Sequence, residues 1–151
     1  MWKLLVKRLN ENARLPTRGH PTSVGMDLYS CEDKIIPPLS SIAPDCLHSM
    51  RFLIGTGLSF AIDPGYGLFI WDRRGLAAKF GLHCIAGVID PEYRGEVKVA
   101  LVNLGQTTYT VNKGDRVAQA VLSPIVVPTL VEVEDLPITT RSSGGFGSTG
   151  E

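Results

Sequence analysis

The C-terminal residues combine a flexible composition with two side chains suited to bind a ligand. Residues 141–151 (RSSGGFGSTGE) are almost all Gly, Ser and Thr, yet they include one Arg and one Phe. Backbone N–H groups in such a segment can surround an anion, Arg141 can pair with a phosphate, and Phe146 offers a ring on which a base can stack. Composition alone favours the alternative, a disordered tail. The placement of Arg141 and Phe146 indicates instead a lid over a nucleotide.

Polar residues also interrupt segments of alternating polarity. In residues 87–96 (GVIDPEYRGE), Asp90 ends a predicted strand and precedes a turn that contains Tyr93. A carboxylate held there can orient and deprotonate a water molecule, whereas the equally favoured alternative is an Asp that caps its own turn. We interpret Asp27 as the structural partner of an Arg. Gln119 lies in an apolar strand, where a buried amide needs a hydrogen-bond partner.

Charge and composition restrict the ligands that the chain can bind. Fifteen basic and fifteen acidic residues cancel, so no net field attracts nucleic acid or an anionic membrane, and we expect a small ligand. No stretch approaches the roughly 20 apolar residues of a membrane span. The three cysteines show no C-x-x-C pair and the three histidines no metal-ligand spacing, which argues against a disulfide framework or a zinc site. We therefore expect a reducing, cytoplasmic location.

The patterning predicts one mostly β domain that positions these residues. Period-two alternation recurs between Gly- and Pro-containing turns, for example at Val97, Val99 and Leu101 and in residues 117–125. Regular turns of this kind favour a sandwich or a barrel. Residues 1–9 are predicted to form a first strand rather than a signal peptide.

One short helix is predicted within residues 72–81. Asp72 is expected to cap its N-terminus, where an anion could bind, and Gly81 to end it. The compact body is predicted to span residues 1–136. Residues 137–151 are predicted to form a flexible Gly/Ser-rich lid, which could extend on the order of 50 Å and so reach a neighbouring subunit.

Five segments in this order resemble the motifs of the trimeric dUTPase family. They are GMDL (25–28), RRGLA (73–77), GVIDPEYRG (87–95), GDRVAQ (114–119) and RSSGGFGSTG (141–150). The third and fifth are the most specific. The resemblance implies a distorted β-barrel or jelly roll that forms a homotrimer, with active sites shared between subunits.

The resemblance also implies an activity, the hydrolysis of dUTP to dUMP and pyrophosphate by attack of water on the α-phosphorus. Asp90 would be the general base, and Tyr93 would pack under the deoxyribose and exclude a ribose 2′-OH. Main-chain groups at Ala86, Gly87 and Ile89 would read the uracil edge.

The remaining implied roles concern the triphosphate. Helix residues and Gln119 would face the phosphates, Arg141 would bind the γ-phosphate and Phe146 would stack on uracil. Mg²⁺ would be chelated by the triphosphate and water, without a direct protein ligand. Asp27 and Arg116 would form a supporting ion pair. The other residues implied in substrate binding are Arg73, Arg74, Gly75, Gly145, Gly147, Ser148 and Thr149.

Two positions depart from the family pattern. Arg74 stands where a Ser usually donates a hydrogen bond to the oxygen that bridges the α- and β-phosphates, so we expect weaker catalysis unless Arg74 turns outward. Asp72 stands where a Pro is common, which should be harmless. Two alternatives stay open, a non-catalytic dUTP-binding interaction module and, with less support, a dCTP deaminase. A eukaryotic copy could also enter the nucleus.

Overall fold

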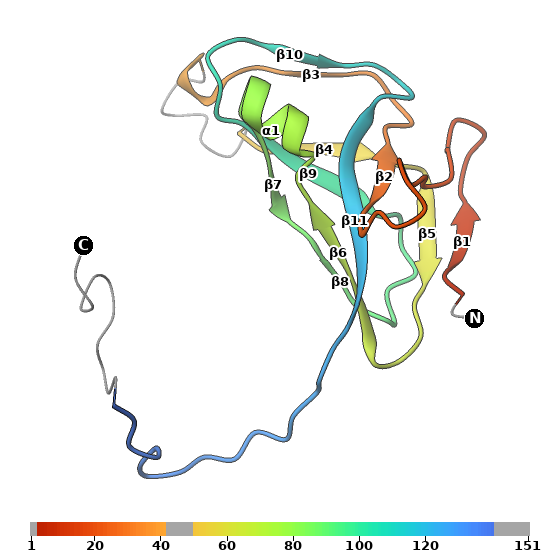
Figure 1. The fold of residues 1–151 in the computed structure, drawn as a ribbon. Helices are drawn as coiled ribbons and strands as arrows, with labels where there is room; N and C mark the ends of the chain where they lie inside the picture. The colour runs from red at the N-terminus through yellow and green to blue at the C-terminus, as the bar shows by residue number, and fades with distance from the viewer. Residues whose placement is uncertain (1–2, 42–49, 141–151) are drawn as a thin grey trace.

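The structure, a computed structural model, describes residues 3–41 and 50–140. These residues form short strands joined by turns, with one helix among them, as the alternating pattern predicts (Figure 1). In chain order the elements are β1 (Leu5–Arg8), β2 (Met26–Tyr29), β3 (Lys34–Ile36), the 3-10 turn η1 (Leu39–Ser41), β4 (Phe52–Gly55), β5 (Leu58–Ala61), β6 (Tyr66–Trp71), α1 (Arg74–Phe80), β7 (Leu82–Ala86), β8 (Val88–Ile89), β9 (Lys98–Asn103), β10 (Tyr109–Val111) and β11 (Arg116–Pro124).

The strands pair between distant parts of the chain. One sheet has the order β2-β11-β6-β8 and another β4-β9-β7, while β1 pairs with β5 and β3 with β10. Figure 1 shows the long strand β11 crossing the molecule between β2 and β6. Because most neighbours are not consecutive in sequence, the chain passes repeatedly from one sheet to another, as in jelly-roll folds. The predicted all-β class is confirmed.

The core lies between the sheets and consists mainly of aliphatic side chains. Leu28, Ile54 and Leu68 come from three different strands and are fully buried. Burying a side chain of this size stabilises the fold by about 1.5–3 kcal/mol. In β9, Lys98 is exposed and Val99 and Leu101 are buried, as the alternation predicts, but Ala100 on the face of Lys98 is buried as well, because this strand is covered on both faces beyond its start.

The helix α1 forms where predicted, but its first residue is not capped by Asp72. Gly81 ends the helix with a φ of 71°, a left-handed conformation that glycine adopts without strain. At the other end Arg73 occupies the capping position and makes no side-chain capping bond. The carboxylate of Asp72 instead binds β7, which lies beside the helix and offers it two donors. The predicted cap is therefore wrong.

The chain leaves the sheets after β11. The N–H of Ile125 still donates to the Gly65 carbonyl oxygen at 2.8 Å, whereas residues 126–140 have no regular secondary structure and are exposed. In Figure 1 this segment extends away from the sheets. The predicted boundary at residue 136 falls within it, and residues 141–151 lie outside the described part. None of the helices in residues 3–41 and 50–140 has the length and hydrophobicity to span a membrane.

Candidate active site

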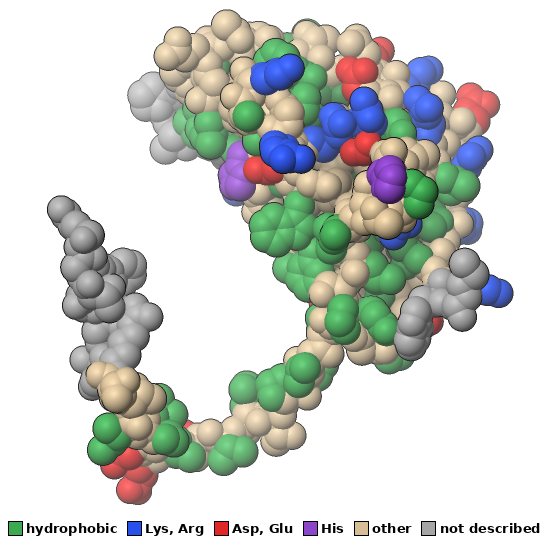
Figure 2. Space-filling view, in the orientation of Figure 1, with side chains coloured by type: hydrophobic (Ala, Val, Ile, Leu, Met, Phe, Trp, Pro, Cys, Tyr) green, Lys and Arg blue, Asp and Glu red, His purple; other side chains and the backbone are tan. Residues whose placement is uncertain are grey.

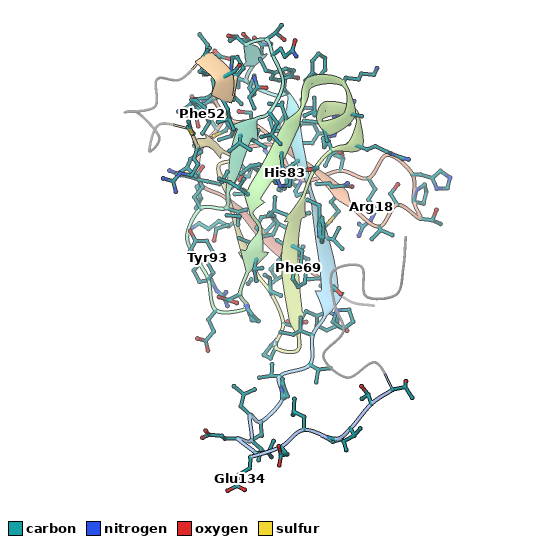
Figure 3. All side chains as sticks on the ribbon, turned by 90° about the vertical axis from the view of Figure 1, so that its left-hand side faces the viewer. Arg18, Phe52, Phe69, His83, Tyr93 and Glu134 are labelled. Atoms are coloured by element: carbon teal, nitrogen blue, oxygen red, sulfur yellow. The ribbon has the colours of Figure 1, made fainter. Side chains whose placement is uncertain are left out.

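Asp90 and Tyr93 line a single cleft. Asp90 follows β8 directly, and the N–H of Tyr93 donates to the Asp90 carbonyl oxygen at 3.1 Å, which closes the turn. Both side chains are exposed to the cleft, which has a volume of 640 Å³. Figure 3 shows Tyr93 at one edge of the molecule, on the side away from Arg18. The other lining residues are Leu53, Val88, Ile89, Glu96, Val97 and Lys98.

The Tyr93 ring is bonded to Glu96 and lies against Gly95. Its hydroxyl donates to the Glu96 carbonyl oxygen at 2.9 Å, and its ring covers Gly95 so closely that a Cβ there would lie 2.4 Å from the hydroxyl oxygen. Only a residue without a side chain leaves room for this packing. The turn therefore presents one flat aromatic face next to the Asp90 carboxylate.

The segment before Asp90 changes sheets at Gly87. Ala86 ends a strand that pairs with β9, whereas Ile89 pairs with Leu68 of β6. Gly87 lies against Ile70, whose N–H donates to the Gly87 carbonyl oxygen at 2.7 Å. Ala86 and Val88 are exposed on either side of Gly87 and belong to edge strands, where backbone N–H and C=O groups can recognise a flat polar ligand edge.

A second group of the predicted residues lies around Asp27. The Nε of Arg73 is 2.9 Å from one carboxylate oxygen of Asp27, and the Nη1 of Arg116 is 3.3 Å from the other. The predicted ion pair between Asp27 and Arg116 is present, and the structure adds Arg73 as a second partner. Asp27 is thus the shared counter-ion of two guanidinium groups, whose like charges would otherwise repel each other.

Gln119 has the partner that its apolar strand requires. Its Nε2 donates to the Asp72 carbonyl oxygen at 2.7 Å, immediately before Arg73. The Asp72 carboxylate accepts the Cys84 N–H at 2.6 Å and lies 2.8 Å from the His83 Nδ1. Burial alone would raise the pKa of Asp72, but the hydrogen bonds from His83 and Cys84 outweigh it and lower the pKa. Gln119 also lines a second cleft, of 310 Å³, beside Asp72.

The comparison with protein families decides what this arrangement represents. The model of the dUTPase family matches residues 11–150 of the chain. The chain belongs to the dUTPase family.

Individual dUTPases are similar to this chain along nearly its whole length. The deoxyuridine 5′-triphosphate nucleotidohydrolase of Nautilia profundicola is 44% identical, with 99% of each chain covered. The one from Yarrowia lipolytica is 48% identical, with 97% of this chain and 88% of that protein covered. Among solved structures, the Staphylococcus bacteriophage 80alpha dUTPase with dUPNHPP superposes with a TM-score of 0.87, at 28% identity and with 99% of each chain covered.

In this dUTPase, Arg74 and Gly75 occupy the first turn of α1 and are exposed. Arg74 makes no hydrogen bond or ion pair with the described residues. Figure 2 shows Lys and Arg side chains gathered, with a few acidic ones, around α1 and the ends of β2 and β11. Arg73, Arg74 and Arg116 thus form a basic surface, and Asp27 pairs with two of the three guanidinium groups.

The structure brings the predicted residues together in two groups rather than one. Ile89, Asp90 and Tyr93 line the 640 Å³ cleft, whereas Ala86 and Gly87 line a cleft of 290 Å³ that shares Val88 with the first. In the other group, Arg73 and Arg116 meet at Asp27, and Gln119 lines a different cleft beside Asp72. The tail residues Arg141, Gly145, Phe146, Gly147, Ser148 and Thr149 lie outside the described residues.

Two polar residues of these sites were not predicted from the sequence. Glu96 lines the first cleft, and His83 binds the Asp72 carboxylate beside the second. Glu96 directly follows the third motif, but its partner Gly57 is distant in sequence, and His83 stands in none of the motifs. Within the described residues, no group of three or more His, Cys, Asp or Glu side chains could hold a metal ion.

Proposed function

We propose that this dUTPase hydrolyses dUTP to dUMP and pyrophosphate by attack of a water molecule on the α-phosphorus, with Asp90 as the general base. The observation that carries the proposal is the pairing of Asp90 with Tyr93 on one cleft, next to exposed strand ends at Ala86 to Ile89. Relatives along nearly the full length are named for this hydrolysis. The protein is accordingly a dUTP diphosphatase.

The cleft geometry supports the expected division of roles. The Asp90 carboxylate is exposed and can accept a proton from a water molecule placed beside it. The Tyr93 ring, held by Glu96 and Gly95, gives the deoxyribose an apolar surface on which a 2′-OH would lose its hydrogen bonds to water. Backbone groups of the β7–β8 switch pair with the uracil edge.

We propose that each complete site combines residues from different copies of the chain, in a homotrimer. The cleft that Asp90 and Tyr93 line includes none of Arg73, Arg116 and Gln119, so within the described residues one copy alone does not surround a nucleotide with both groups. The segment that leads to the tail also exposes apolar side chains, with Val126 90%, Leu130 91% and Ile138 100% exposed. Burial of such side chains against a second copy would stabilise the assembly.

Magnesium ions would enter with the substrate. A triphosphate supplies oxygen ligands that Mg²⁺ prefers, and water completes its coordination. When bound, the ion would neutralise charge that develops on the pyrophosphate leaving group. From this chain, Arg73 and Arg116 offer guanidinium donors to the phosphates, and Arg141 of the tail would contribute a third.

The test is steady-state release of pyrophosphate from dUTP with Mg²⁺, for the wild-type chain and for Asp90→Asn. Asn keeps the size of the side chain but cannot accept the proton, so kcat should fall by about 10²–10⁴-fold with dUTP binding retained. UTP, dTTP and dCTP serve as controls. Unchanged turnover in Asp90→Asn would refute the role of Asp90.

Other outcomes of the same assay separate the alternatives. Tight binding of dUTP by the wild-type chain without turnover would replace the enzyme by a nucleotide-dependent interaction module. Release of ammonia from dCTP would indicate a deaminase. Light scattering tests the trimer, and a monomer under native conditions with full activity would exclude shared sites.

A further inference from the structure

Glu96 follows the turn that carries Asp90 and Tyr93, and both its side chain and its backbone carbonyl make contacts. Residues 92–95 are exposed, whereas the side chain of Glu96 is only 26% exposed. Its Oε1 accepts the Gly57 N–H at 2.8 Å, and its Oε2 lies 3.7 Å from the Nζ of Lys98. Its backbone carbonyl oxygen accepts the Tyr93 hydroxyl at 2.9 Å. Glu96 therefore connects the Tyr93 ring to a different part of the fold.

The bonds on either side of Glu96 join the same two segments. The Ser59 hydroxyl donates to the Arg94 carbonyl oxygen at 2.7 Å, and the Val97 N–H donates to the Leu58 carbonyl oxygen at 2.8 Å. The buried Thr56 hydroxyl donates to the Val97 carbonyl oxygen at 2.6 Å. The second half of the turn is thus fixed along the connection between β4 and β5 and the start of β5.

Gly57 presents its N–H to Glu96 from an unusual backbone conformation. Its φ is 64°, and a Cβ there would meet Asn10 and Ala13 at 2.7 and 2.8 Å. A left-handed, tightly enclosed glycine cannot easily turn its N–H elsewhere. If the Glu96 carboxylate were removed, this N–H would lose its partner, while the bonds of Thr56, Leu58 and Ser59 to residues 94–97 would remain.

We propose that Glu96 is a positioning residue that sets the sugar selectivity of the site by fixing the Tyr93 ring. The inference rests on the proposed function, in which this ring packs under the deoxyribose. To exclude a ribose 2′-OH, the Tyr93 ring must keep one position. A displacement of about 1 Å in an active site can cost on the order of 100-fold in rate. Loss of the Glu96 carboxylate should therefore reduce the discrimination between dUTP and UTP more than it reduces the stability of the fold.

The chain offers a closely matched control in Glu32. Its Oε1 accepts the N–H of Gly55, the last residue of β4, at 2.7 Å, so it makes the same type of bond two residues before Gly57. No hydrogen bond or ion pair joins Glu32 to residues 90–96 in the described part of the chain. If the Glu96 carboxylate served only to hold this part of the fold, Glu32→Ala and Glu96→Ala would change the selectivity for dUTP over UTP alike.

The experiment measures kcat and KM for dUTP and for UTP in the wild-type chain, Glu96→Ala, Glu96→Gln and Glu32→Ala. We expect the ratio of kcat/KM for dUTP to that for UTP to fall by about 10-fold or more in Glu96→Ala. Glu96→Gln keeps an oxygen acceptor for the Gly57 N–H and should restore the ratio. Glu32→Ala should keep the wild-type ratio.

Each result has a defined meaning. An unchanged ratio in Glu96→Ala, or an equal fall in Glu32→Ala, overturns the inference while dUTP turnover by the wild-type chain still supports the proposed function. Absence of wild-type dUTP turnover refutes the proposed function itself. If Glu96→Ala does not fold, Glu96→Asp takes its place, because the shorter side chain withdraws the carboxylate from the Gly57 N–H. A fall in the ratio for Glu96→Asp then supports the inference, and a wild-type ratio overturns it.

Discussion

A single methyl group at Gly87 should impair catalysis, because this residue marks the switch from one sheet to the other. A Cβ at Gly87 would lie 2.3 Å from the carbonyl oxygen of Ile70, whereas ordinary contacts begin at 3.4 Å. In Gly87→Ala the two backbones must therefore separate by about 1 Å, since neither belongs to a flexible side chain. That shift would also stretch the bond from the Ile70 N–H to the Gly87 carbonyl oxygen.

The expected costs follow from this displacement. Overpacking of this kind typically costs about 1–3 kcal/mol of stability. Because β8 leads directly to Asp90, we expect the kcat/KM for dUTP to fall on the order of 100-fold, the usual effect of a 1 Å displacement at a reacting group.

The assay combines thermal unfolding with pyrophosphate release from dUTP. Gly19→Ala is the control, since a Cβ at Gly19 meets nothing within 4 Å, and it should behave as wild type. If Gly87→Ala keeps wild-type kcat/KM while its melting temperature falls, the β7–β8 switch does not determine the geometry of the site. That result would refute the argument.

Two further predictions concern the phosphate side and the residues behind it. Arg74→Ser should raise kcat for dUTP, on the order of 100-fold if a hydroxyl at this position reaches the leaving group; equal rates would show that the exposed Arg74 side chain leaves the chemistry unaffected. Burial, together with the neighbouring Asp72 carboxylate, raises the pKa of Cys84 to about 12 from 9.0. The folded chain then keeps a proton that the unfolded chain releases, so the free energy of unfolding should fall as the pH rises from about 9 to about 12, which denaturant titrations can measure. Alkylation of Cys84, followed by mass spectrometry, should be faster in Asp72→Asn, and an unchanged rate would contradict the influence of the carboxylate.

Features that depend on near neighbours were predictable from the sequence. Strands follow from period-two alternation, as at Val99 beside Lys98, because side chains alternate between the faces of a sheet whatever its partners are. The end of α1 follows from Gly81, since a left-handed residue is a local requirement. The turn between Asp90 and Tyr93 also closes through a bond between residues three apart.

Partner choice, in contrast, was decided only by the tertiary structure. Asp72 could have capped the helix next to it, yet two donors on β7 compete for its carboxylate. Gln119 meets Asp72 across 47 residues, Arg73 meets Asp27 across 46 and Glu96 meets Gly57 across 39.

The same limit applies to the arrangement of the site. The order of the motifs indicated which residues act together, but not that one chain places Asp90 and Tyr93 on one cleft and Gln119 on another. Local propensity fixes each strand and turn because it acts within a few residues. The pairing of strands, which brings distant residues into contact, is determined by how the whole core packs.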